Sequence, residues 1–440
     1  MIKRFIQRVF GFKQAGPLRM PKGKHGLARD SISPPALRVC EGLAERGHAA
    51  YVVGGAVRDL LLGIKPKDFD IATDARPEQV KPLFRRALLI GRRFRLVHVM
   101  IGGETVEVST FRAADTGEAQ RTEHGRVLRD NVFGTIEQDA RRRDFTVNAL
   151  YYDPATEEVI DYHGGLADLR RRRLRMIGDP EARYREDPVR MLRAARLGAK
   201  LGLTLDADTR APIRRLAPLL EHVPPPRLFE EMLKLLLSGH ASACLRQLRE
   251  EGLSKGLLPL LDVILEQPLG ERFVTLALAQ TDERIQTGRP VSPAFLFAAL
   301  LWHEVLSAWR AHQLRGEHSL QALESAMDEV LEVQCAKLAI TRRLTSAMRE
   351  VWGMQPRFEQ RSGQRPQHLV ESPRFRMAYD FLALRAASGE VPAEIEAWWR
   401  AFQTADPGTR HAMLLPDTGP KKRRRRRRRK APGQGAVSAA

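Results

Sequence analysis

The chain has little cysteine and no long hydrophobic run. Its 440 residues include only three cysteines, Cys40, Cys244 and Cys335, which lie far apart. This spacing excludes a disulfide framework and a cysteine zinc site, and it favours a reducing, cytoplasmic environment. No apolar run reaches the roughly 18 residues of a membrane-spanning helix. With an apolar fraction of 43%, the composition is that of a globular protein of two or three domains.

Negative charge is scarce relative to positive charge. The chain has 53 acidic residues against 73 lysines and arginines, a net charge of +20. Half of this excess comes from one run of ten cations, Lys421 to Lys430. Such a balance indicates a polyanionic partner, and nucleic acid is the usual one. We expect the run to be disordered and to contact RNA; the simpler interpretation is a solvated tail with nonspecific contacts.

The first twelve residues show a helical pattern of apolar and basic side chains. Apolar residues recur at i, i+3, i+4, i+7 and i+8: Ile2, Phe5, Ile6, Val9 and Phe10. This pattern predicts a basic amphipathic helix. It lacks the continuous apolar segment of a secretory signal. Two interpretations stay open: contact with a membrane surface, or docking on the protein body.

The stretch from Tyr51 to Thr73, YVVGGAVRDLLLGIKPKDFDIAT, combines several chemical signals. Its apolar start predicts a buried strand, followed by a turn at Gly54 and Gly55 and a helix from Ala56 to Leu62. Glycines that lead into a helix N-terminus favour an anion site. Arg58, in the first helical turn, can reach a phosphate with its forked guanidinium group.

Two carboxylates follow this turn. Asp68 and Asp70 are spaced i, i+2, which in a strand places both on one face. Hard oxygen ligands beside a phosphate site suit Mg²⁺, so the pattern indicates phosphoryl or nucleotidyl transfer. Downstream, Gly102-Gly103 joins two β-rich runs, Arg95–Ile101 and Thr105–Thr110, which predicts a hairpin. Glu107 joins the carboxylates if its strand pairs near them, and is otherwise an exposed strand residue.

The stretch resembles the nucleotidyltransferase superfamily that includes DNA polymerase beta. Within it, the chain is similar to the bacterial branch that holds poly(A) polymerases and CCA-adding tRNA nucleotidyltransferases. The resemblance covers roughly residues 25 to 240, and it implies two Mg²⁺ ions held by Asp68 and Asp70. It also implies that Gly54, Gly55 and Arg58 hold phosphates of an incoming nucleotide.

Two downstream blocks carry the same resemblance. In RRRDFTVNALYYD, Arg143 and Asp144 match residues that orient the nucleotide; from the residues alone, Asp144 is also a candidate N-cap for a helix over 146–150. In REDPVRMLRAARLGAKLGL, Asp187 and Arg190 match a pair that reads the edge of the incoming base, and Arg193 adds a phosphate or base contact. Without the resemblance, Asp187 and Arg190 form an ordinary i, i+3 salt bridge.

The predicted fold class is α+β. A basic amphipathic segment (1–30) precedes a small mixed α/β nucleotidyltransferase head (31–175). An all-helical neck (176–240) and body (241–405) follow, and then a disordered Arg-rich tail (406–440). Helices are predicted at 35–45, 77–86, 191–203, 226–237, 241–250 and 295–309. The last ordered helix of the chain is predicted to end near residue 402. A polar stretch at 113–130 is predicted to be a loop.

The resemblance implies an enzyme that adds AMP from ATP to RNA 3′ ends in the cytoplasm, without a template. The segment from Leu88 to Gly102, together with the Arg-rich tail, favours a poly(A) polymerase. The nearest alternative is a CCA-adding enzyme, which shares every motif named above. A second alternative is a noncatalytic RNA-binding protein, against which the intact Asp68 and Asp70 argue. RNA preference, tail length and oligomeric state stay open.

Overall fold

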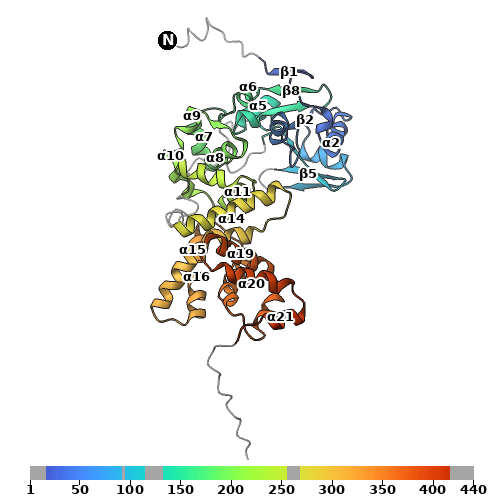
Figure 1. Ribbon diagram of the computed structural model, residues 1–440. Helices are drawn as coiled ribbons and strands as arrows, with labels where there is room; N and C mark the ends of the chain where they lie inside the picture. Colours follow the sequence, from blue (N-terminus) through green and yellow to red (C-terminus); the bar gives the residue numbers. More distant parts are fainter. Residues whose placement is uncertain (1–15, 92–94, 114–131, 255–267, 417–440) are drawn as a thin grey trace, which may run out of the picture. The chain divides into compact units, whose positions relative to one another are not determined.

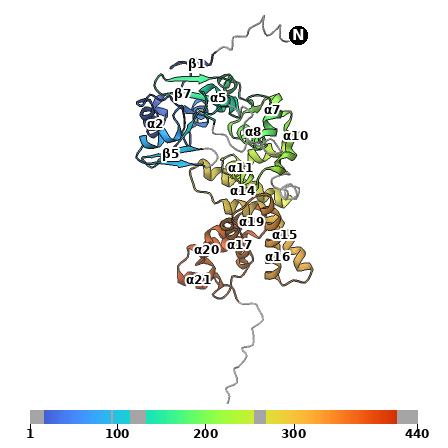
Figure 2. The ribbon, with the colours of Figure 1, turned by 180° about the vertical axis from the view of Figure 1, so that it is seen from behind.

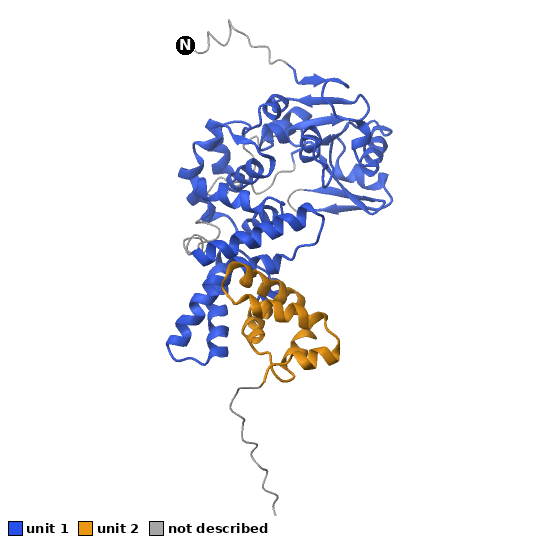
Figure 3. Cartoon of the chain, viewed as in Figure 1, with its two compact units in different colours: residues 1–348 blue, residues 349–440 orange. Residues whose placement is uncertain are grey.

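The computed structural model describes residues 16–91, 95–113, 132–254 and 268–416 (Figure 1). The predicted N-terminal helix, nearly all of the polar loop and the basic run at 421–430 lie outside these ranges. The chain forms two compact units, residues 1–348 and residues 349–440 (Figure 3). No helix in the described ranges is both long and apolar enough to span a bilayer.

A mixed sheet of eight strands forms the centre of the head, in the order β1-β8-β7-β2-β3-β6-β5-β4. Among the pairs of this sheet only β3 and β6 are parallel; the others are antiparallel. Its strands are β1 (Leu18–Met20), β2 (Ala50–Val53), β3 (Asp70–Thr73), β4 (Ala87–Ile90), β5 (Leu96–Ile101), β6 (Glu104–Thr110), β7 (Leu150–Asp153) and β8 (Glu158–Asp161). The predicted first strand and the predicted hairpin of β5 and β6 are confirmed.

Several helices pack against the sheet. α2 (Pro34–Ala44) begins after Ser33, whose hydroxyl caps it, and contacts β2, β3 and β6. α5 (Ile136–Arg142) contributes Ala140 to a buried cluster with residues of β2, β3, β7 and β8: Val53, Ala72, Tyr151 and Ile160. Short elements complete the head: η1 (Arg29–Ser31), α3 (Gly55–Leu61), α4 (Pro77–Val80), η2 (Lys81–Leu83), η3 (Thr146–Asn148), α6 (Gly165–Arg170) and β9 (Arg173–Leu174). Of these, α3 and α4 also contact strands of the sheet.

The head differs from the prediction at three places. The predicted helix over 77–86 ends early, because α4 turns into η2 at Lys81 and the chain then enters β4. The predicted N-terminal segment is partly in the sheet, since β1 pairs with β8. β3 begins at Asp70, so Asp68 lies before the strand and not in it. The exposed side chains of Asp68 and Asp70 still alternate with the buried side chain of Phe69, as they would in a strand.

Helices make up most of the described residues after the head. In the first unit they are α7 (Pro180–Glu186), α8 (Val189–Leu201), α9 (Ala207–Arg210), α10 (Ile213–Leu216), η4 (Ala217–His222), α11 (Pro225–Leu236), α12 (Ala241–Glu250), α14 (Pro268–Gln286), α15 (Pro293–Leu314) and α16 (Ser319–Lys337), with the short strand β10 (Thr204–Leu205). The predicted helices over 191–203, 226–237, 241–250 and 295–309 are confirmed, and the α+β class with them. α15 and α16 lie side by side in both views (Figures 1 and 2).

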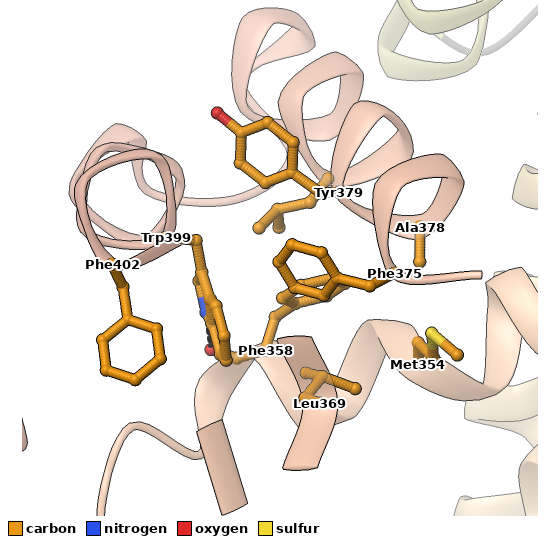
Figure 4. Close-up of a cluster of buried hydrophobic side chains, with 9 residues drawn as sticks. Met354, Phe358, Leu369, Phe375, Ala378, Tyr379, Trp399 and Phe402 are labelled. Carbon is orange, nitrogen blue, oxygen red and sulfur yellow. Dashed lines mark hydrogen bonds between the residues drawn. The ribbon is translucent and has the colours of Figure 1, made fainter. Parts of the chain in front are cut away.

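The second unit has its own hydrophobic core. α17 (Arg342–Met354) leads into η5 (Gln355–Glu359), α18 (Arg365–Val370), α19 (Phe375–Ser388), α20 (Ala393–Thr404) and α21 (Pro407–Met413). Trp399 lies between Phe358 and Phe402 in this core (Figure 4). Its indole N–H donates to the carbonyl of Phe358 over 2.8 Å, so the ring's polar atom is satisfied.

The prediction that the chain is disordered from residue 406 onward is wrong for residues 406–416. Asp406 caps α21 by accepting from the backbone N–H groups of Gly408 and Thr409. The indole of Trp398 donates to the carbonyl of Met413. The basic run lies beyond the described residues.

Candidate active site

A glycine turn brings two guanidinium groups together. Gly54 has φ 77° and ψ −127°, a conformation that favours glycine. A Cβ on Gly54 would lie 3.4 Å from Nη1 of Arg143, and one on Gly55 would lie 3.6 Å from Nη2 of Arg58. The turn from β2 into α3 is therefore lined by cations on both sides, as a phosphate site requires.

The acidic residues meet in one row across the sheet. Asp70 of β3 and Glu107 of β6 are direct register partners, which settles the open question of where Glu107 lies. The pKa of Asp70 is raised to about 7, and the largest cause is desolvation by the surrounding protein, although the residue keeps some contact with solvent. The charges of Glu107 and Asp68 add to it, and Arg143 opposes it. The three carboxylates and Arg143 are thus within electrostatic reach of one another.

This donor set fits Mg²⁺. The carboxylates supply hard oxygen ligands, and their mutual repulsion at Asp70 is the kind that a divalent cation relieves. Within the described ranges, no three acidic, histidine or cysteine side chains are close enough to hold an ion by themselves. Mg²⁺ does not need such a cage, because it usually binds one or two carboxylates together with phosphates and water.

Arg143 is held by a buried carboxylate. Its Nη2 donates to Asp139 over 3.0 Å, and its Nε donates to the hydroxyl of Tyr151 over 3.0 Å. Tyr151 in turn donates to Asp139 over 2.8 Å. Burial lowers the pKa of Arg143, but Tyr151 and Asp139 outweigh it, so this pKa lies above its usual range and the group stays charged. The contacts with Asp139 of α5 and Tyr151 of β7 therefore hold the charged guanidinium group of Arg143 beside Gly54.

A chain of polar contacts joins the glycine turn to the neck. Arg58 donates through Nε and Nη2 to Asp59 and through Nη1 to Asn148. Asn148 donates to Asp144 over 3.1 Å, and Asp144 lies 3.5 Å from Nη1 of Arg193 on α8. Asp144 does not cap η3, because it accepts from the N–H of Phe145, one residue on; the N-cap alternative is wrong.

The neck residues at the predicted base site are also paired. Nη2 of Arg227, on α11, lies 2.9 Å from Oδ2 of Asp187. Nη1 of Arg190 donates to Glu186 over 2.6 Å. Asp187 and Arg190 thus each have another partner. Burial raises the pKa of Asp187, but Arg227 and, with smaller effects, Arg190 and Arg193 outweigh it, so this carboxyl stays ionised.

Arg183 connects this neck site to the head. Its Nη2 donates to the backbone carbonyls of Arg142 and Arg143, over 2.7 and 2.8 Å. Its Nη1 donates to Glu186, which also accepts from Arg190. The position of the base-site arginine is thus tied to the backbone that carries Arg143.

Lys200 lies near the opposite end of α8. Burial lowers its pKa; the charges of Asp59 and Asp68 act against this, and Arg58 and Arg196 reinforce it. An α8 cation is therefore within electrostatic reach of the acidic row and the glycine turn.

The structure brings the residues named from the sequence into two neighbouring groups. One contains Gly54, Gly55, Arg58, Asp68, Asp70 and Arg143. The other contains Asp187 and Arg190, and Asp144 with Arg193 lies on the polar chain between them. Sequence reasoning assigned no role to five supporting residues, Asp139, Asn148, Tyr151, Lys200 and Arg227. Asp139 and Arg227 lie outside the motifs quoted above, and the contacts of the other three depend on the packed fold.

Three family models match the chain. They are a Poly A polymerase head domain at residues 50–175, a probable RNA and SrmB-binding site of polymerase A at residues 202–265, and a polymerase A arginine-rich C-terminus at residues 315–431. The poly(A) polymerase I of Salmonella typhi is 46% identical over 94% of this chain and 92% of its own length. That of Haemophilus influenzae is 45% identical over 90% of this chain and 91% of its own.

CCA-adding enzymes are more distant relatives. One from Geobacillus stearothermophilus is 41% identical, but over 51% of this chain and 55% of its own length. The solved structure of the Bacillus stearothermophilus CCA-adding enzyme in complex with CTP has a TM-score of 0.56 at 29% identity, covering 84% of this chain and 82% of that one. The Thermotoga maritima enzyme complexed with tRNA has a TM-score of 0.58 at 19% identity, covering 92% of each chain, and shows the fold alone.

Proposed function

Since the chain belongs to the bacterial poly(A) polymerase family, we propose how its residues carry out the adenylyl transfer that this membership entails. The protein is an enzyme that polyadenylates RNA. We propose that it takes AMP from ATP and adds it to single-stranded RNA 3′ ends. The observation that carries the assignment of residues is the acidic row of Asp70 and Glu107 within reach of Arg143, which itself contacts the glycine turn.

The reaction forms one phosphorus–oxygen bond and breaks another. The 3′-oxygen of RNA bonds to the α-phosphorus of ATP, the 3′-hydroxyl loses its proton to water, and the bond between the α-phosphorus and the bridging oxygen breaks, which releases pyrophosphate. Asp68 and Asp70 would hold two Mg²⁺ ions, with Glu107 as a further oxygen ligand beside Asp70. The ions would lower the pKa of the 3′-hydroxyl and neutralise charge on the pyrophosphate.

The chain's own cations would position the nucleotide. Arg143, charged and fixed by Asp139 and Tyr151, would bind phosphate at the turn of Gly54 and Gly55. Arg58 would add a contact on the other side of that turn. Asp144 would orient the nucleotide with Arg143, and Arg193, which lies 3.5 Å from Asp144, would hold this carboxylate against the neck.

Base choice would lie with Asp187 and Arg190. A carboxylate accepts from the exocyclic amine of adenine, and a guanidinium donates to its ring nitrogen. Support for this role comes from the ionised state of Asp187 and from the side-chain and backbone contacts that hold both residues. Guanine and uracil present a carbonyl where adenine has its amine, so an ionised Asp187 would repel them.

We also propose RNA processing and decay in the cytoplasm as the setting. The three cysteines are free, and Cys40 and Cys244 are buried, which suits a reducing compartment. Contact of the first twelve residues with a membrane surface stays a prediction.

The test uses the full chain with Mg²⁺, each nucleoside triphosphate separately, and two RNAs. One RNA is an unstructured oligonucleotide and the other is a tRNA that lacks its 3′ end. We expect long AMP tails on the oligonucleotide and poor use of CTP. Addition of two CMP and one AMP to the tRNA, followed by arrest, would contradict the proposal. Asp68→Ala should abolish AMP addition while RNA binding persists. Asp208→Asn, which removes an exposed carboxylate on α9, is the control and should keep both.

A further inference from the structure

The acidic row continues across the sheet to its edge. Asp70 pairs with Glu107, Glu107 with His98 of β5, and His98 with Leu88 of β4. Directly paired residues on adjacent strands project from the same face of a sheet. The row Asp70, Glu107, His98 and Leu88 therefore runs on one face, from the proposed metal ligands to the edge strand.

Among the residues that the structure describes, one half of this face is covered and the other half is exposed. α5 covers the inner half through Ala140, which packs in the cluster with Val53 of β2 and Ala72 of β3. On the outer half, Leu88 is 53% exposed, and Ile90, two residues along the same strand, is 40% exposed. The proposed metal ligands lie where the covered half meets the open half.

Exposed apolar side chains on an edge strand favour aggregation, so those that persist commonly mark a binding site. Leu88 and Ile90 lie on the same face as the proposed metal ligands. Nε2 of His98 lies 3.6 Å from Oε2 of Glu107, so the imidazole is next to the acidic row. His98, Leu88 and Ile90 together form a partly apolar surface on this face, which we call the outer shelf.

Three groups have to be seated around the acidic row: the triphosphate of ATP, the base of ATP and the RNA 3′ end. The triphosphate is accounted for at Gly54 and Arg143, on the β2 side of Asp70, and the incoming base at Asp187 of the neck. The remaining substrate is the RNA end, whose 3′-oxygen must reach the carboxylates. The β6 side of Asp70, which leads to the outer shelf, is assigned neither the triphosphate nor the incoming base.

We propose that the outer shelf seats the base of the RNA's 3′-terminal nucleotide, with His98 stacking against its face and Leu88 and Ile90 contacting it. This inference rests on the proposed function. Nucleobases stack on flat side chains, including histidine, without sequence readout, because every base has a π-face. Such a contact suits an enzyme whose own product becomes its next substrate.

The experiment measures RNA and ATP separately on the full chain. The RNA is a short oligonucleotide with 2-aminopurine at its 3′ end, whose fluorescence falls when the base stacks. Leu88→Ser and His98→Ala should each raise the KM for RNA about tenfold, leave the KM for ATP within about twofold, and reduce the quenching. His98→Phe, which keeps a flat ring, should restore RNA affinity and quenching.

Leu320→Ser is the matched control, because Leu320 is 58% exposed on α16, away from the row. Its KM for RNA should equal that of the wild type. Thermal unfolding checks that Leu88→Ser is folded, as expected for an exposed position.

Three results would overturn the inference. They are an unchanged KM for RNA in Leu88→Ser, a loss in His98→Phe as large as in His98→Ala, or a change of oligomeric state in Leu88→Ser with RNA binding intact. The last would assign β4 to a protein partner. Failure of the proposed function would look different, because the wild type itself would then add no AMP to any RNA.

Discussion

The substitution Asp70→Asn tests the acidic row through stability as well as activity. Burial and the charges of Glu107 and Asp68 raise the pKa of Asp70 to about 7, against about 3.9 for a free aspartate. A difference of about 3 units corresponds to about 4 kcal/mol if nothing screens it. Asp70 keeps contact with solvent, so we expect only about 1 to 2 kcal/mol in practice.

The pH window follows from the direction of this shift. Below pH about 4 the Asp70 carboxyl is protonated in both the folded and the unfolded chain. As the pH rises from there through 7, the unfolded chain loses this proton before the folded protein does, so the fold loses stability. Asp70→Asn removes the charge, and the variant should therefore be more stable than the wild type at pH 8 and about equal to it at pH 4.

Mg²⁺ should offset much of this difference. At ten times its Kd, an ion that binds only the folded state adds about 1.4 kcal/mol to the free energy of unfolding, or about 2 °C in Tm for a unit of this size. The wild type should gain this stability at pH 8, and Asp70→Asn, which lacks one ligand, should gain much less while adding no AMP to RNA.

Thermal unfolding of the wild type and of Asp70→Asn at pH 4 and pH 8, with and without Mg²⁺, measures both the pH dependence of stability and the stabilisation by the ion. Asp208→Asn, which removes an exposed carboxylate outside the row, should show none of these changes. A variant less stable than the wild type at pH 8, or one that Mg²⁺ stabilises equally, would refute the reasoning.

Three further predictions concern other parts of the chain. Gly54→Ala should cost about 1 to 3 kcal/mol of stability and most of the activity, whereas Gly47→Ala, which shares a positive φ but has open space, should cost stability alone; equal activities would contradict the role of the turn. Arg227→Gln removes the largest charge that lowers the pKa of Asp187. The acid limb of the pH profile of kcat/KM for ATP should therefore move to higher pH, and selection for ATP should relax. An acid limb at the same pH would contradict a role of Asp187 and Arg227 in base choice. Deleting Lys421–Lys430 should flatten the plot of log affinity for RNA against log salt by about 0.7 for each RNA phosphate that the run neutralises, and an unchanged slope would show that the run does not bind RNA.

The sequence was most informative where the chemistry is local. Gly54, Gly55, Asp68 and Asp70 lie within 23 residues, so their spacing alone predicts a turn beside two carboxylates. The place of Glu107 could only be stated conditionally, because it depends on the parallel pairing of β3 with β6, which no local pattern encodes.

Supporting residues were missed for the same physical reason. Asp187 and Arg227 are 40 residues apart and meet only after α8 and α11 pack. The contacts that hold Arg143 likewise come from two elements: Asp139 lies on α5, before the quoted motif, and Tyr151 lies on β7, so their meeting depends on the packing of α5 against the sheet. One miss was avoidable: Asp406 followed by Pro407 is an N-cap signal, and the Arg-rich composition beyond it obscured the short helix α21.

The aromatic residues divide the chain into regions with different optical signals. All five tryptophans lie between Trp302 and Trp399, whereas five of the six tyrosines lie between Tyr51 and Tyr184. Tryptophan emission therefore reports on the helical body and the second unit, where Trp399 is fully buried. Tyrosine absorbance reports mainly on the head and the start of the neck. The unlabelled protein thus carries two intrinsic probes, and comparing them during denaturation would reveal whether its two units unfold together.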